Sequence, residues 1–170
     1  MDSFLETERL TLRRLYIEDA GFILKLLNSP GWLEFIGDRN VKTIAAAEAY
    51  ILSGPVKSYE ENGFGLSLVS LKDGGNPIGA CGLLKRDYLD HPDIGFAFLT
   101  EYMGQGYGYE SAKAIMEYAK KELNLKNILA FTVPNNIASI KLLEKLGFRF
   151  DKTFNMPGED EELLLFTNQP

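Results

Sequence analysis

The sequence predicts a mixed α/β (α+β) fold, with a central mixed sheet of about six to seven strands flanked by about four helices. Three observations favour it. The 170 residues are the length of one domain, spanning 1–170. Hydrophobic residues make up 45% and charged residues 25%, as in ordinary globular proteins. Strand-like and helix-like patterns then follow one another in an order that suits one sheet covered by helices.

In the first half, the predicted elements are a strand at 9–16, helices at 19–27 and 43–62, and strands at 64–71 and 77–84. The strands place apolar residues at a period near two, and the helices at a period near 3.6. Asp19 and Thr43 are of the residue types that cap helix N-termini, so we expect them to cap these two helices. The segment Asn28-Ser29-Pro30-Gly31 ends the first helix, and Gly54-Pro55 interrupts the second. The pair Asp73-Gly74 between the two strands is typical of a hairpin turn.

In the second half, the predicted elements are a strand at 94–99, a helix at 107–123, a strand at 128–133, a helix at 138–146, and strands at 148–154 and 163–167. The long helix is amphipathic, with Ala112, Ile115 and Ala119 on one face. Gly147 is a helix stop. A strand, a helix and a strand follow one another between 94 and 133, so those two strands should be parallel.

Charge and cysteine content exclude several classes of protein. Eighteen basic and 24 acidic residues give a net charge of −6 and a pI near 4.9, which argues against general nucleic-acid binding. With a single cysteine, Cys81, and a single histidine, neither an internal disulfide nor a metal site is expected. Cys81 is interpreted as an inward strand residue. No signal peptide or membrane segment is visible, so we expect a cytoplasmic protein.

The most informative segment runs from Tyr102 to Glu110, between a strand and the longest helix. Its glycines at alternate positions, Gly104, Gly106 and Gly108, allow the backbone to curl and expose successive N–H groups. The following helix adds its unpaired N–H groups and the positive end of its dipole. This pattern favours a phosphate or pyrophosphate site, although a tight turn that binds nothing has the same spacing. Neither a dinucleotide fingerprint nor a Walker loop fits the segment.

A second polar segment, Val133 to Ser139, follows the next strand. Asn136 can cap the last helix, which alone would explain it. Ser139 lies one turn into that helix. Because the carboxyl ends of parallel strands meet at one edge of a sheet, Asn136 and Ser139 should face the crevice beside the glycine segment.

These segments resemble motifs of a known family. The run 104–110 is similar to motif A of the GNAT N-acetyltransferases, and 136–148 to their motif B. The runs 6–13 and 78–83 resemble the branch containing the ribosomal-protein N-terminal acetyltransferases RimJ and RimL. The resemblance implies a GNAT-like sheet with two splayed parallel strands, whose opening a bulge at Gly95 would mark. It also implies an acetyl-CoA site without metal, lined by Phe98, Leu99, Thr100, Met103, Gly104, Gln105, Gly106, Tyr107, Gly108, Tyr109, Asn136 and Ser139.

The resemblance also implies catalytic roles. Many members place a tyrosine on the last helix to protonate the departing thiolate, whereas this sequence has Leu143 there. Ser139 is therefore the candidate to hydrogen-bond the thiolate. Asp93 stands where relatives often have a glutamate base, and His91 and Glu101 are the other candidate bases.

Basic residues near these motifs carry less information. Arg9, Arg13 and Arg14 are interpreted as surface charges on an early strand. Lys141 and Lys145 on the last helix are candidates to meet the 3′-phosphate of CoA, or form a solvated face.

The expected reaction is direct attack of a primary amine, on a small molecule or a peptide N-terminus, on the acetyl-CoA thioester. The acceptor would be read by loops at 33–41 and 85–93 and by the C-terminal tail. The acidic cluster Glu159–Glu162 favours a cationic acceptor. Two alternatives are a non-catalytic acyl-CoA-binding module or sensor, suggested by Met103 and Leu143, and a nucleotide-binding protein. The sequence predicts no oligomeric state.

Overall fold

The computed structural model describes residues 2–170 and contains one eight-stranded sheet, in the order β1-β2-β3-β4-β5-β6-β8-β7. Its strands are β1 (Leu5–Glu6), β2 (Leu10–Arg14), β3 (Leu66–Leu71), β4 (Pro77–Leu84), β5 (Asp93–Phe98), β6 (Leu129–Thr132), β7 (Arg149–Phe154) and β8 (Leu163–Thr167). Neighbouring strands are antiparallel except β5 and β6. The predicted mixed sheet and its parallel pair are confirmed. The extra strand is β1, which is too short to show periodicity.

The helices are α1 (Ala20–Leu27), α2 (Pro30–Phe35), α3 (Ile44–Ile51), α4 (Lys57–Asn62), α5 (Tyr107–Lys121) and α6 (Ile137–Lys145). Short turns of helix, η1 (Ile17–Asp19) and η3 (Thr100–Tyr102), precede α1 and α5. The predicted interruption at Gly54-Pro55 is a π-helical turn, η2 (Leu52–Val56), that joins α3 to α4. Such a turn accommodates Pro55, which has no N–H to donate.

The predicted stop of the first helix is confirmed, since α1 ends at Leu27 with Asn28 as its C-cap. The sequence did not predict α2, in which Pro30 takes the first helical position, where no N–H donor is needed. One prediction in this region is wrong. Asp19 does not cap α1. Its carboxylate instead accepts hydrogen bonds from the Tyr16 N–H and from Arg13. Thr43 does cap α3, accepting from the Ala46 N–H at 3.1 Å.

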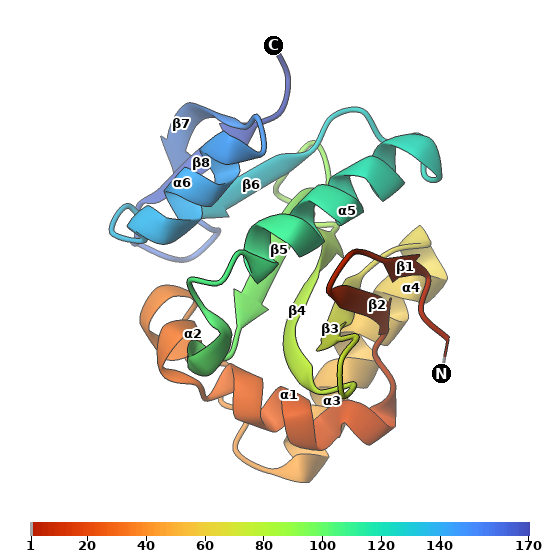
Figure 1. Cartoon of the computed structure of the whole chain (residues 1–170). Helices are drawn as coiled ribbons and strands as arrows, with labels where there is room; N and C mark the ends of the chain where they lie inside the picture. The colour runs from red at the N-terminus through yellow and green to blue at the C-terminus, as the bar shows by residue number, and fades with distance from the viewer. Residues whose placement is uncertain (1) are drawn as a thin grey trace.

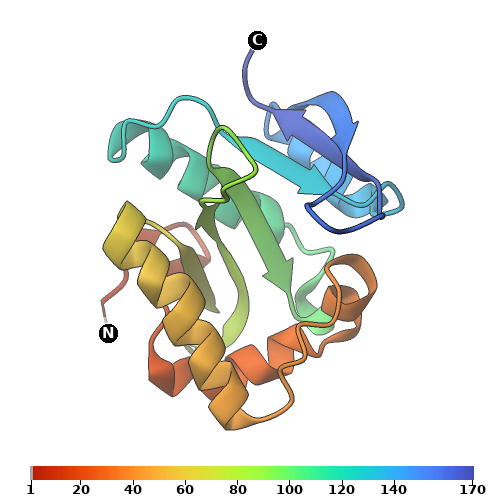
Figure 2. The ribbon, with the colours of Figure 1, turned by 180° about the vertical axis from the view of Figure 1, so that it is seen from behind.

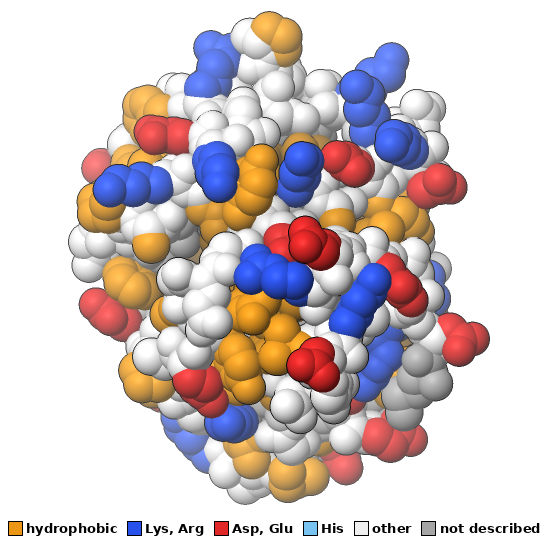
Figure 3. Space-filling model, viewed as in Figure 1, with side chains coloured by type: hydrophobic (Ala, Val, Ile, Leu, Met, Phe, Trp, Pro, Cys, Tyr) orange, Lys and Arg blue, Asp and Glu red, His pale blue; other side chains and the backbone are white. Residues whose placement is uncertain are grey.

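Helices cover both faces of the sheet. α5 and α6 lie over one face (Figure 1), and α1, α3 and α4 lie over the other, which we call the rear face (Figure 2). Ile115 of α5 and Leu143 of α6 pack with Ile94 in one core cluster. Ile23 of α1 packs with Leu68 in a second cluster on the opposite side of the sheet. Figure 3 shows acidic and basic side chains interspersed around a central apolar area on the α5–α6 side.

β5 and β6 diverge after a single contact. Asp93 and Leu129 form the one backbone pair between them, and the Leu129 N–H donates to the Pro92 carbonyl at 2.9 Å. The predicted splay is thus present, but the predicted bulge at Gly95 is wrong, since β4 and β5 keep one register from end to end. The crevice opens on the β6 side of β5, while the β4 side stays fully paired.

Across residues 2–170, no helix has both the length and the apolar character required to cross a bilayer.

Candidate active site

The glycine loop (residues 103–109) lies at the open end of the crevice, where the chain runs from the end of β5 through η3 into the first residues of α5 (Figure 1). Gly104 and Gly106 have φ values of +73° and +85°, a region that favours glycine. Within residues 2–170, none of the N–H groups of residues 104–109 donates a hydrogen bond to the protein. The loop therefore presents consecutive unpaired donors at the positive end of α5, an arrangement suited to an anion.

Gly108 is required for packing rather than for a turn. A Cβ on Gly108 would come within 2.8 Å of Leu142 Cδ1 on α6 and 3.7 Å of Phe98 Cε2. The absence of a side chain lets the first turn of α5 approach both α6 and β5. This close approach keeps the loop next to the crevice.

The backbone at the end of β5 is partly available to a ligand. The Leu99 N–H donates to the Ile78 carbonyl at 2.9 Å, and the Leu99 carbonyl accepts from the Tyr102 N–H at 2.9 Å. Polar groups of an antiparallel strand alternate in direction, so those of Phe98 point toward β6 and the crevice. Of these neighbours, Phe98 rather than Leu99 has backbone groups left for a bound molecule.

Thr100 and Met103 frame the entry to the loop. Thr100 is exposed, and its carbonyl accepts from the Met103 N–H at 3.2 Å. The Met103 side chain is 45% exposed and lies so close to Gly31 of α2 that an added Cβ there would be 2.6 Å from Met103 Cε. Met103 therefore connects the loop to α2, and its own N–H is already used.

Asn136 and Ser139 lie at the N-terminus of α6, on the other side of the crevice. The Asn136 side-chain oxygen accepts from the Ser139 N–H at 3.2 Å, which confirms Asn136 as the helix cap. Both residues are half-buried. The Ser139 hydroxyl has no partner within residues 2–170 and remains free to donate. The interpretation of Asn136 as a cap and its proposed ligand role are compatible, because its amide NH₂ group is not used by the cap.

Asp93 lies at the closed end of the crevice and is only 2% exposed. Its carboxylate accepts a hydrogen bond from Arg86 Nε at 2.9 Å. Burial raises the pKa of Asp93, and the nearby Arg86 guanidinium, which lowers it, does not fully offset that effect. The guanidinium also donates to the Tyr88 hydroxyl at 3.1 Å and lies 4.8 Å from the centre of the Phe131 ring.

Other candidates have mostly structural surroundings. Cys81 is fully buried, and burial raises its pKa to about 12, so it is not a nucleophile at neutral pH. Glu101 is exposed and pairs with Lys25 at 3.4 Å. Lys145 Nζ lies 4.0 Å from the centre of the Tyr109 ring, at the edge of the glycine loop. The described residues 2–170 contain no cluster of three potential metal ligands.

Two arginines at the site were not predicted to be part of it. Arg9 contacts the glycine loop, where its Nη1 donates to the Gln105 carbonyl at 3.0 Å. Its Nε pairs with Glu110 in the first turn of α5 at 2.7 Å. Arg86 is held by Asp93 as described above. The Arg9 contact joins residues about a hundred positions apart, which periodicity cannot reveal, whereas Arg86 and Asp93 lie close enough in sequence for their opposite charges to suggest a pair.

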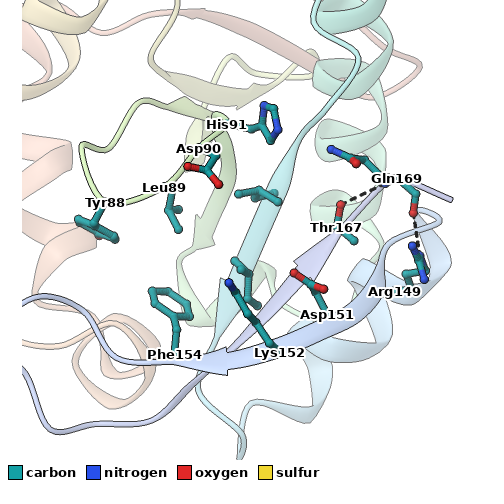
Figure 4. A pocket seen from close by; sticks show the side chains of 12 residues that line it. Tyr88, Leu89, Asp90, His91, Arg149, Asp151, Lys152, Phe154, Thr167 and Gln169 are labelled. Atoms are coloured by element: carbon teal, nitrogen blue, oxygen red, sulfur yellow. Dashed lines mark hydrogen bonds between the residues drawn. The ribbon is translucent and has the colours of Figure 1, made fainter.

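A cavity of about 370 Å³ lies on the rear face, where the β4–β5 loop meets β7 and β8 (Figure 4). Leu129, the backbone partner of Asp93, lines it. Asp90 and His91 line it from the loop, and Asp151 and Lys152 line it from β7 (Figure 4). Within residues 2–170, no ion pair is formed by Asp90, Asp151 or Lys152. Two of the three segments expected to read the acceptor thus meet at one cavity, next to the closed end of the crevice.

A splayed parallel pair beside a loop of free N–H groups is the arrangement that the resemblance to the GNAT acetyltransferases implies. The sequence comparison is specific. Residues 9–149 match the model of the acetyltransferase (GNAT) domain family. The chain belongs to this GNAT family and is an acetyl-CoA-dependent N-acetyltransferase. The predicted family and reaction class are confirmed.

Known relatives agree with this assignment. The chain is 30% identical over 146 residues to the uncharacterized N-acetyltransferase p20 of Bacillus licheniformis, covering 85% of this chain and 82% of that protein. It is 29% identical over 150 residues to the uncharacterized N-acetyltransferase YnaD of Bacillus subtilis, covering 88% of this chain and 85% of that protein.

Solved structures share the fold. An acetyltransferase from Agrobacterium tumefaciens superimposes with a TM-score of 0.82 at 23% identity, over 100% of this chain and 95% of that one. The RimL ribosomal alpha-N-protein acetyltransferase in complex with coenzyme A superimposes with a TM-score of 0.83 at 13% identity, over 98% and 97% of the two chains. At these identities the likeness is one of fold.

Proposed function

We propose that this enzyme acetylates a primary amine, with the α-amine of a peptide N-terminus as the leading acceptor, and that acetyl-CoA lies in the crevice between β5 and β6. The observation that carries this proposal is the row of unpaired N–H groups at residues 104–109 beside the opened parallel pair. Acetyl-CoA supplies both the activated acetyl thioester and a pyrophosphate that such a row of donors would hold.

The chain's own residues divide the task of binding. The pyrophosphate would be held by the backbone N–H groups of the glycine loop, namely those of Gly104, Gln105, Gly106, Tyr107, Gly108 and Tyr109. The Phe98 backbone would bind the pantetheine arm, next to the Leu99 and Thr100 backbone. Asn136 would use its free amide NH₂ group from the α6 side. Met103, whose N–H is already paired, would contribute only apolar contact.

Proton transfer would use groups from the two sides of the crevice, Asp93 of β5 and Ser139 of α6. Asp93 at the closed end would accept the proton of the attacking amine. Because burial raises its pKa, it is a better base near neutral pH than an ordinary aspartate. Ser139, with its free hydroxyl, would donate a hydrogen bond to the departing thiolate. Neither role needs a covalent enzyme intermediate.

The choice of amine follows from the cost of deprotonation. An α-amine has a pKa of about 7.7–8.0 and a lysine side chain about 10.4, so at pH 7 the neutral amine costs about 1 kcal/mol for the former and about 4–5 kcal/mol for the latter. The Asp93 carboxylate, which is itself paired with Arg86, is better suited to deprotonating an α-amine than a lysine side chain. Relatives by fold include a ribosomal-protein-S5-alanine acetyltransferase and a spermidine N-acetyltransferase, both of which act on amines.

The rear cavity is the proposed place for the acceptor. It adjoins the closed end of the crevice through Leu129, and its carboxylates Asp90 and Asp151 have no ion-pair partner. Those carboxylates would attract an amine in its cationic form before it loses its proton. The acidic β7–β8 turn, Glu159–Glu162, is exposed and would add to the same attraction.

A thiol-release assay with acetyl-CoA tests the proposal against a panel of peptides with different N-terminal residues, N-acetylated copies of the same peptides, lysine-containing peptides and spermidine. We expect turnover with free peptide N-termini and none with the blocked copies. Turnover restricted to spermidine or lysine side chains would overturn the proposed acceptor. Failure of the folded protein to bind CoA in calorimetry would overturn the proposed cofactor site.

A paired variant tests the cavity. Replacing Asp90 and Asp151 with asparagine should raise the KM for the acceptor several-fold and leave the KM for acetyl-CoA unchanged. An unchanged acceptor KM would remove the cavity from the acceptor site.

A further inference from the structure

Arg9 is bound to the glycine loop although it precedes β2 and lies far from the loop in sequence. Its Nη1 donates to the Gln105 carbonyl at 3.0 Å, and its guanidinium carbon lies 4.3 Å from the centre of the Tyr107 ring. A Cβ on Gly106 would be 3.2 Å from Arg9 Nη2. One side chain therefore contacts three consecutive residues of the loop. The Arg9 side chain is 41% exposed, so this is a surface contact.

The bond to Gln105 fixes the direction of a peptide group. In a planar trans peptide, the Gln105 carbonyl and the Gly106 N–H point in opposite directions. While Arg9 holds the carbonyl on its own side, the Gly106 N–H must point to the other side, with the remaining free donors of the loop. The positive φ of Gly106 allows this peptide to turn either way, because glycine has no Cβ to oppose it. A flipped peptide would replace a donor by a carbonyl oxygen.

Arg9 also neutralises the nearest carboxylate. Glu110 lies in the first turn of α5, one turn from the free N–H groups. It accepts from Arg9 Nε at 2.7 Å, from the Arg9 N–H at 2.9 Å and from the Thr7 hydroxyl at 2.6 Å. Glu110 thus anchors the segment before β2 to α5. Without its cationic partner, this carboxylate would repel a phosphate bound at the same helix end.

We propose that Arg9 is a positioning residue for acetyl-CoA: it orients the Gln105–Gly106 peptide and cancels the charge of Glu110, so that the loop offers donors without a bare carboxylate beside them. This inference rests on the proposed pyrophosphate site. It extends that site to a residue that lies outside motifs A and B, in the N-terminal run 6–13.

The test measures coenzyme A binding by calorimetry, with no turnover required. Arg9→Ala should raise the Kd for CoA about tenfold, the effect of one uncompensated charge near a protein surface. Arg9→Ala combined with Glu110→Gln should recover most of that loss, because the repelling charge is gone as well. Arg9→Lys should fall in between, since an ammonium keeps the charge but lacks the fork that reaches both partners. In steady-state kinetics, the KM for acetyl-CoA should rise with kcat nearly unchanged.

Arg14 provides the matched control. It is on β2, it is exposed, and it lies 4.9 Å from the centre of the Tyr59 ring rather than at the loop, so Arg14→Ala should leave the Kd for CoA unchanged. Urea unfolding of each variant without ligand separates weaker binding from loss of fold. If Arg9→Ala does not fold, Arg9→Lys carries the same comparison.

Two results would overturn the inference: an unchanged Kd in folded Arg9→Ala, or a double variant that binds no better than Arg9→Ala. Both differ from failure of the proposed function, in which the unaltered protein itself does not bind CoA.

Discussion

Strand β5 has an arginine–carboxylate pair near each of its ends, and the two pairs differ in almost every respect. At its start, Asp93 is bound by Arg86, with side chains 3% and 23% exposed. Beyond its end, Glu110 of α5 is bound by Arg9, with side chains 18% and 41% exposed. The first pair is where β5 and β6 still touch, and the second adjoins the loop where they have diverged.

The same chemistry produces opposite effects on the acid. Burial raises the pKa of Asp93, and a single hydrogen-bonded arginine does not reverse that. Burial raises the pKa of Glu110 too, but hydrogen bonds from Thr7 and Arg9 outweigh it, so the net pKa is lowered. The number of hydrogen-bond donors relative to burial, rather than the presence of an arginine, decides whether a carboxyl here resembles a base or a fixed anion.

The largest effect is expected from breaking the buried pair. Arg86→Met leaves Asp93 buried without a partner, which should cost roughly 3 kcal/mol of stability at pH 7, measured by urea unfolding. The double variant Arg86→Met with Asp93→Asn should recover most of that loss, since no charge remains buried. A single variant within about 0.5 kcal/mol of the unaltered protein would show that the pair contributes little.

The next effect comes from the open end. Gly106→Val places a β-branched residue at φ +85° and should cost about 1–2 kcal/mol of stability. It should also raise the Kd for CoA roughly 10–100-fold by removing charge-assisted hydrogen bonds worth about 1.5–3 kcal/mol. Gly158→Val, at φ +79° in the β7–β8 turn, has similar strain and should bind CoA normally. Equal CoA affinity in the two variants would show that the glycine loop does not bind the phosphates of CoA.

A variant of Ser139 tests the α6 side of the crevice, which carries neither of the two arginine–carboxylate pairs. Ser139→Ala should lower kcat about tenfold, the loss of one hydrogen bond that forms as the thiolate departs. The Kd for CoA should change little. Ser53→Ala on the exposed surface, where the hydroxyl bonds only the Ala49 carbonyl, is the control for the substitution itself. Turnover at the original rate in Ser139→Ala would remove Ser139 from the mechanism.

The smallest effect is the pH dependence that distinguishes the two acids. The folded pKa of Asp93 is raised, so its stabilisation relative to Asp93→Asn is present below the unfolded pKa, near 3.8, and is lost as pH rises through the folded pKa. The folded pKa of Glu110 is lowered, so its stabilisation relative to Glu110→Gln is present above the unfolded pKa, near 4.5, and is lost as pH falls through the folded pKa. Because the pair of Glu110 with Arg9 is partly exposed to solvent, the stabilisation by Glu110 should be under about 1 kcal/mol.

Urea unfolding from acidic to neutral pH should therefore give difference curves of opposite slope for the two variants. Parallel curves would mean that the two environments do not differ as described.

The sequence predicted the parts of the fold that depend on local pattern. The hairpin at Asp73-Gly74, the parallel pair and the amphipathic α5 all come from periodicity and turn chemistry that a short window contains. Where one residue type has two uses, the pattern was incomplete or wrong. The first helix does end before Asn28, but Pro30 also begins α2, which was not predicted. The Asp19 carboxylate bonds Arg13 and Tyr16 rather than capping the helix that follows.

The parts of the candidate site that backbone groups form could be predicted from the sequence. The contacts between side chains that are distant in sequence were harder to predict. Glycine spacing indicated the loop, and an asparagine before a helix indicated the cap at Asn136. Arg9 was interpreted as a surface charge because nothing near it in sequence identifies Glu110 or Gln105 as partners. Arg86 and Asp93, by contrast, are seven positions apart, so their opposite charges could have suggested a pair.

The burial of Cys81 has a practical consequence. As the chain's single cysteine, sealed inside the sheet, it should not react with aromatic disulfide reagents while the protein stays folded. Coenzyme A released during turnover can therefore be followed by such reagents without a background from the enzyme. The same thiol becomes reactive once the core opens, so its rate of labelling in ligand-free protein reports how often the sheet around β4 opens. The same sulfur atom is thus unreactive in the activity assay and a probe of local opening in the labelling experiment.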